Sequence, residues 1–141
     1  MAVELLVVLA TSKAPDWSSW NQALWDARAP VSLARSVDLP SYNGFLPARV
    51  KGRATGFYFQ VEPGTDLAVR YPALASLPLA KPIVYSLSYG AHPAECAAVF
   101  LSAAVLVSRF GGVVFDPQQN LLLSLEQVND GARQCMGLFS K

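Results

Sequence analysis

The residues with the clearest capacity for chemistry are a histidine and a cysteine that lie close together in the chain. His92 stands four positions before Cys96, with Glu95 between them, where a helix is expected to begin. A thiolate beside an imidazole at a helix N-terminus is the arrangement that activates a cysteine nucleophile. Cys96 also begins the apolar face of this helix, where a cysteine is more often an inert core thiol. We therefore favour a structural Cys96, predict no catalytic residue, and keep a small cysteine-dependent enzyme as an alternative.

Metal, cofactor and disulfide chemistry find little support in the sequence. His92 is the only histidine, and the two cysteines, Cys96 and Cys135, stand far apart without a CxxC pair. This spacing predicts neither a zinc site nor a disulfide framework. The strings GxGxxG, GxxxxGK[ST], GxSxG and HExxH are absent as well. We expect no metal, no cofactor and, because unpaired cysteines are typical of reducing compartments, a cytoplasmic location.

The charged side chains are few and nearly balanced. The chain has 11 Lys and Arg against 10 Asp and Glu, which gives a formal net charge of +1. Proteins dedicated to nucleic acids normally carry a basic stripe that neutralises phosphates. Arg49, Lys51 and Arg53 gather near aromatic residues on one expected hairpin, a mixture that single-stranded nucleic acid can exploit. Three charges are a small footprint, so we expect a solvated turn there and no nucleic-acid partner.

The composition predicts one folded domain over residues 1–141. Hydrophobic residues make up 52% of the chain and charged residues 15%, and a chain of this length buries about two-thirds of its unfolded surface. The longest apolar stretch, 96–107, is shorter than the roughly 20 residues that a membrane span needs. The apolar start, 5–10, lacks the preceding basic residues of a signal peptide. We therefore expect a single domain without a membrane span.

Hydrophobic periodicity predicts the elements that position these residues. The unbroken apolar run 5–9 indicates a central strand, and the spacing of Trp17, Trp20 and Leu24 indicates a helix over 17–29 that Asp16 caps. Further strands are expected over 31–37, 83–89, 113–115 and 121–123, with a hairpin over 44–62, a short helix over 66–71, a helix from Pro93 to Phe110 and a last helix that Ser124 and Gln127 cap. This order predicts an α+β sandwich in which about three helices cover an antiparallel or mixed sheet.

Five features stand in order along nearly the whole chain. They are ELLVVL at 4–9, Trp20 in the first helix, GFLP at 44–47 followed by GF at 56–57, AECAA at 94–98, and GGVVFDPQ at 111–118. Together they resemble a family of small bacterial proteins often encoded beside polymorphic toxins or type VI secretion effectors. The resemblance implies an immunity protein, which is a non-enzymatic partner that binds one cognate toxin and blocks its active site or its substrate access. Tyr58 departs from the acidic residue expected after Gly-Phe in similar sequences.

An inhibitor of this kind needs aromatic anchors and a few charges on a rigid surface. In the second strand of the hairpin, alternation places Tyr58, Gln60 and Glu62 on the less apolar face, which we choose as the interface. The predicted partner-binding residues are Tyr42, Phe45, Tyr58, Gln60, Glu62, Asp66, Tyr89 and Glu95, and Trp25, one position off its helical stripe, is a further candidate anchor. The alternative role is an adaptor or chaperone that holds a secreted effector without abolishing its activity.

Overall fold

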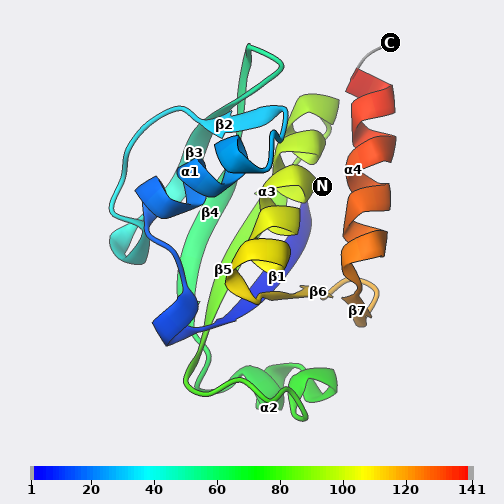
Figure 1. The fold of residues 1–141 in the computed structure, drawn as a ribbon. Helices are drawn as coiled ribbons and strands as arrows, with labels where there is room; N and C mark the ends of the chain where they lie inside the picture. The colour runs from blue at the N-terminus through cyan, green and yellow to red at the C-terminus, as the bar shows by residue number, and fades with distance from the viewer. Residues whose placement is uncertain (1, 140–141) are drawn as a thin grey trace.

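One antiparallel sheet of seven strands organises the protein, in the order β2-β3-β4-β5-β1-β6-β7 (Figure 1). The computed structural model describes residues 2–139. The strands are β1 (Val3–Ala10), β2 (Val31–Leu33), β3 (Asn43–Val50), β4 (Arg53–Pro63), β5 (Pro82–Tyr89), β6 (Val113–Asp116) and β7 (Leu121–Leu123). The helices are α1 (Trp17–Asp26), α2 (Leu67–Arg70), α3 (Pro93–Phe110) and α4 (Leu125–Phe139). The predicted α+β fold class is confirmed, and every strand pairing is antiparallel.

Two elements end earlier than their sequence patterns predict. The first helix was expected over 17–29, but α1 ends at Asp26 because Ala29 N–H donates back to Leu24 O at 3.0 Å and closes the last turn. A strand was expected over 31–37, but β2 ends at Leu33. Ala34 N–H still donates to Pro47 O at 2.9 Å, and Pro47 has no N–H to return the bond, so the ladder stops there.

Helices α1, α3 and α4 cover one face of the sheet (Figure 1). Trp20 of α1 is fully buried there, with its ring 5.6–6.3 Å from the rings of Phe57, Phe59 and Tyr85. Helix α3 is long and apolar enough, by length and composition, to cross a membrane. Its packing between the sheet and the helices α1 and α4 accounts for that composition, because a helix that is apolar on most sides suits a core.

A disulfide between Cys96 and Cys135 joins α3 to α4, with the two Cα atoms 5.6 Å apart. The prediction of no disulfide was therefore wrong. Helix α3 carries its cysteine near its start and α4 near its end, and β6 and β7 connect the two helices. Because the two helices are antiparallel, the start of α3 lies beside the end of α4, and the cysteines meet although 39 positions separate them. Closely spaced cysteine pairs in the sequence do not reveal a bond of this kind.

The second face of the sheet is covered over only part of its area. Figure 1 shows the segment from α2 to β5 at the lower ends of β4 and β5, and its Leu67 and Leu74 pack on a small apolar cluster of this face that includes Leu6, Val8 and Phe115. The rest of this face, on the β3 side, has polar side chains and no covering element among residues 2–139. That uncovered area contains four of the eight residues predicted to bind a partner.

Candidate functional site

The uncovered area is formed by side chains from three neighbouring central strands. Tyr58 of β4 lies opposite Ser88 of β5, which in turn lies opposite Glu4 of β1, and Gln60 lies opposite Ser86 in the next row. We call the surface formed by Glu4, Tyr58, Gln60, Glu62, Ser86 and Ser88 the polar sheet face. These residues share one side because alternate residues of a strand point to the same face of the sheet. A depression of about 250 Å³ lies over five of them, all except Glu62.

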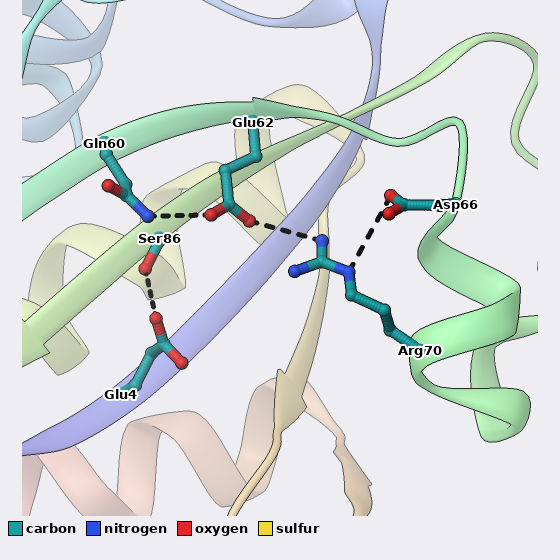
Figure 2. Close-up of polar contacts among 6 residues, drawn as sticks. All are labelled: Glu4, Gln60, Glu62, Asp66, Arg70 and Ser86. Atoms are coloured by element: carbon teal, nitrogen blue, oxygen red, sulfur yellow. Dashed lines mark hydrogen bonds and ion pairs between the residues drawn. The ribbon is translucent and has the colours of Figure 1, made fainter.

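A chain of polar contacts runs from β4 to α2 (Figure 2). Gln60 Nε2 donates to Glu62 Oε1 at 2.7 Å, and Arg70 Nη2 donates to Glu62 Oε2 at 3.3 Å. Arg70 Nε also lies 3.7 Å from Asp66 Oδ1. Desolvation acts to lower the pKa of Arg70, but its hydrogen bond to Glu62 and the charges of both carboxylates outweigh this and raise that pKa. Arg70 therefore ties α2 to the edge of the polar sheet face and holds Glu62 in place.

Glu4 and Ser86 make a second, separate contact (Figure 2). Ser86 Oγ donates to Glu4 Oε2 at 2.6 Å, and Ser86 is only 3% exposed. Within residues 2–139, no Lys or Arg lies within ion-pair distance of Glu4. The polar sheet face thus offers one carboxylate held by a hydroxyl and one held by an amide and a guanidinium, and both retain acceptor capacity for a partner's donors.

An exposed aromatic pair borders these polar groups. Phe45 of β3 lies directly opposite Tyr58, with ring centroids 5.4 Å apart in an edge-to-face arrangement, and the two residues are 39% and 59% exposed. Gly56 makes room for this pair, since a Cβ atom there would stand 2.6 Å from the Phe45 ring. The structure therefore explains the residue types at 56 and 57. Gly56 leaves space for the Phe45 ring, and Phe57 is buried in the core.

The structure brings five of the eight predicted partner-binding residues to one region. Phe45, Tyr58, Gln60 and Glu62 lie on the second face of the sheet, and Asp66 lies beside it through Arg70. Tyr42, Tyr89 and Glu95 lie elsewhere. Tyr42 packs against the core and its hydroxyl donates to Phe45 O.

Tyr89 and Glu95 belong to the helix-covered side. The Tyr89 ring lies 6.1 Å from that of Phe100 in α3, and burial, with a smaller contribution from the charge of Asp116, raises the Tyr89 pKa. Glu95 Oε1 accepts a hydrogen bond from Gly90 N at 2.9 Å. Glu95 therefore stabilises the entry into α3, and neither residue adjoins Tyr58.

Sequence reasoning missed three members of this region, Glu4, Ser86 and Ser88, and also Arg70. The two serines alternate with Tyr85 and Leu87 along β5, and polar residues at every second position of an apolar strand indicate an uncovered face. That signal was available in the sequence. The position of Glu4 beside them follows from the pairing of β1 with β5, which no local pattern predicts.

The other chemical candidates are dispersed. The Cys96 sulfur is bonded to Cys135 and is not a free nucleophile in this structure, and His92 makes no side-chain capping bond at the start of α3. No group of three His, Cys, Asp or Glu residues within 2–139 is placed to hold a metal ion. Of the three hairpin cations, Arg53 lies over the ring of Phe139, 5.1 Å from its centre.

The geometry suits contact with another macromolecule better than capture of a small molecule. A depression of about 250 Å³ is smaller than the roughly 300–1,000 Å³ of typical ligand sites. Exposed aromatic rings next to charged groups are the usual energetic centre of a protein interface. Comparisons with known protein families, with curated proteins and with solved structures found no match to this chain.

Proposed function

We propose that this protein is an immunity protein, which binds a cognate antibacterial toxin through the polar sheet face and blocks the toxin's active site or its substrate access. The observation that carries the proposal is the exposed Phe45–Tyr58 pair on the same sheet face as the carboxylates of Glu4 and Glu62. The ordered sequence features that resemble immunity proteins support the same role. Binding a toxin needs no cofactor. We propose the cytoplasm as the location, against the Cys96–Cys135 disulfide, which is typical of oxidising compartments.

The charges of this region indicate the kind of toxin surface that it fits. Three carboxylates, Glu4, Glu62 and Asp66, lie in or beside this face, and Arg70 pairs with the last two. Complementary charge speeds association and selects among partners, so the cognate toxin surface is expected to be basic. Toxins that act on nucleic acids have basic clefts because they must bind phosphates.

Co-expression of this protein with the product of the neighbouring gene tests the proposal. The neighbour is induced in a sensitive bacterium with and without this protein, survivors are counted, and the complex is purified. Rescue of growth together with a stable, inactive complex supports an immunity protein. A stable complex in which the effector stays active supports the alternative, an adaptor or chaperone. A harmless neighbour, or killing regardless of this protein, contradicts both roles for this pair.

Two substitutions test the chosen face. Tyr58→Ala and Glu62→Arg are each expected to weaken toxin binding at least tenfold, as the loss of a central interface residue does. The matched control is Glu126→Arg, which makes the same charge change at an exposed position of α4. Toxin affinity that is unchanged in both variants, in proteins with an unaltered unfolding midpoint, contradicts the polar sheet face as the interface.

A further inference from the structure

A second surface feature lies at the turn end of the β3–β4 hairpin, where α1 ends beside the edge strand β2 (Figure 1). A groove of about 770 Å³ runs there between the end of α1 and the turn that joins β3 to β4. Its walls include Trp25 and Arg28 on one side and Arg49 and Lys51 on the other. None of these four residues belongs to the polar sheet face.

Trp25 is exposed in a way that the fold does not require. The side chain is 78% exposed, whereas Trp20 on the same helix is fully buried. Exposed tryptophan is uncommon on a surface that binds nothing, and tryptophan is enriched at the energetic centres of protein interfaces. The ring therefore supplies a large apolar contact at the entrance of the groove.

The groove also has an excess of positive charge. Arg28, Arg49 and Lys51 line it against one carboxylate, Asp26, which accepts a hydrogen bond from Gln22 Nε2 at 2.9 Å. Within residues 2–139, none of the three cations lies within ion-pair distance of a carboxylate. The lining is thus basic while the polar sheet face is acidic, although the whole chain has a net charge of only +1.

Two of these cations occupy backbone positions that favour other residue types. Arg28 has a φ of 56° just after α1, and Lys51 has a φ of 50° in the two-residue turn that it forms with Gly52. Glycine or asparagine is preferred at both kinds of position, and another residue costs about 1 kcal/mol. Local folding therefore does not explain why both positions carry a positive charge.

We propose that this groove binds an acidic, extended segment of a partner protein. Carboxylates of the segment pair with Arg28, Arg49 and Lys51, and an apolar side chain of the segment packs on the Trp25 ring. The free edge of β2 is not the means of recognition, because Asn21 Oδ1 already accepts the Leu33 N–H at 2.9 Å. Recognition therefore occurs through side chains and not through addition of a strand.

Single-stranded nucleic acid fits the groove less well. Proteins that bind it without sequence preference stack successive bases on several aromatic side chains along a basic path. Trp25 is the only aromatic residue among those that line the groove, and Asp26 in the same wall repels phosphates. An acidic peptide needs only one apolar anchor and a few cations.

Fluorescence anisotropy with labelled probes tests the proposal on the intact protein. The probes are a glutamate-rich peptide with one central leucine, the same peptide with glutamine in place of glutamate, and oligothymidylate of similar length. We expect the glutamate peptide to bind, its affinity to fall with added salt, and the glutamine peptide to bind at least tenfold more weakly. Absence of glutamate-peptide binding, or equal binding of the glutamine peptide, overturns the proposal, and tighter binding of oligothymidylate assigns the groove to nucleic acid instead.

Substitutions locate the binding site and separate binding from folding. Trp25→Ala is expected to weaken glutamate-peptide binding about tenfold, and Lys51→Asn about threefold, as for one exposed ion pair. Lys51→Asn places a preferred residue in the turn, so its unfolding midpoint should stay the same or rise. The control Arg109→Gln removes an exposed cation from the end of α3 and should change nothing. Unchanged binding in both Trp25→Ala and Lys51→Asn overturns the assignment to this groove, whatever the outcome of the toxin experiment.

Discussion

Phe57 and Tyr58 are neighbours on β4, and their exposed fractions are 0% and 59%. Phe57 points into the core beneath α1 and α3, while Tyr58 points out over the polar sheet face. The strands β1, β4 and β5 all bury residues on the helix-covered side, among them Val7, Leu87 and Phe59. For these two neighbouring residues, strand alternation separates a side chain that holds the fold together from one that is available to a partner.

The second face is itself divided. Near α2 it is apolar and covered, with Val84 and Phe115 fully buried, and towards β3 it carries Gln60 and Tyr58. An antiparallel sheet can leave one face in water without cost when its side chains are polar. Here the division falls within single strands, so the uncovered half is a defined surface bordered by the covered half, and Arg70 marks the boundary between them.

The largest difference between the two faces should appear when Phe57 and Tyr58 are each replaced by alanine. Phe57→Ala empties a fully buried site against Trp20 and should lower the free energy of unfolding by about 3–5 kcal/mol. Tyr58→Ala removes an exposed ring and should cost about 1 kcal/mol or less, most of it from the pair with Phe45. Urea unfolding measures both. Similar losses for the two variants would contradict the division of β4 into a core face and a free face.

The next effect concerns the helix-covered face and its disulfide. Reduction of the Cys96–Cys135 bond, or the double substitution of both cysteines by alanine, should lower the free energy of unfolding by about 3–4 kcal/mol, because the bond closes a loop of 39 positions in the unfolded chain. The polar sheet face should keep its toxin affinity, since α4 does not contribute to it. Unfolding curves with and without reductant measure the effect, and identical curves would contradict a bond in the native protein.

The disulfide also tests the predicted cytoplasmic location. Disulfides persist in oxidising compartments, and thiols are kept reduced in the cytoplasm. Alkylation of the protein in intact cells, followed by mass spectrometry, counts free cysteines. Alkylation of both cysteines would agree with a cytoplasmic protein. Alkylation of neither would indicate an oxidising compartment, and the protein would then bind its toxin in that compartment.

Elements with strong local signals could be predicted closely. Helix α3 has the predicted bounds because Pro93 suits a first turn and Gly111, with a φ of 72°, ends the helix. Asp116 accepts hydrogen bonds from Gln118 N and Gln119 N, which is the usual role of an aspartate that begins a turn. Each of these signals acts between residues close in sequence. Cysteine pairing across 39 positions and the strand order depend on contacts between distant segments, which no local pattern contains.

The candidate site divides in the same way. Tyr58, Gln60 and Glu62 share a face, as the alternation in one strand predicts. Glu4 joins them only because β1 pairs with β5, and Glu95 does not join them because its helix covers the other side. The residues that share a face within one strand could therefore be predicted from the sequence. The surface that three neighbouring strands form together could not.

A pH experiment tests how tightly the helix-covered side is closed. Burial, with a smaller contribution from the charge of Asp16, raises the pKa of Tyr85 from 10.0 to about 12, and its hydroxyl donates to Pro15 O at 2.7 Å. Between these two values the unfolded chain loses the tyrosine proton while the folded chain keeps it. This group's contribution is therefore complete below pH 10 and is lost as pH rises towards about 12, by about 2–3 kcal/mol.

Tyr85→Phe provides the control for that experiment. The variant loses one hydrogen bond, worth about 1 kcal/mol, and should lose less stability than the wild-type protein as the solution becomes alkaline. Urea unfolding on both sides of the ordinary tyrosine pKa measures the difference. Parallel pH curves for the two proteins would show that Tyr85 ionises as readily in the folded state as in the unfolded state.

The smallest expected effect lies within the polar sheet face and concerns two serines of β5. Ser86 is 3% exposed and its hydroxyl holds Glu4 at 2.6 Å, so Ser86→Ala should lower the free energy of unfolding by about 1 kcal/mol. Ser88 is the matched control, because it lies on the same face of the same strand, is less buried and makes no side-chain hydrogen bond within residues 2–139. Ser88→Ala should change stability by less than about 0.5 kcal/mol. An equal loss in both variants would mean that the Ser86–Glu4 hydrogen bond does not stabilise the fold.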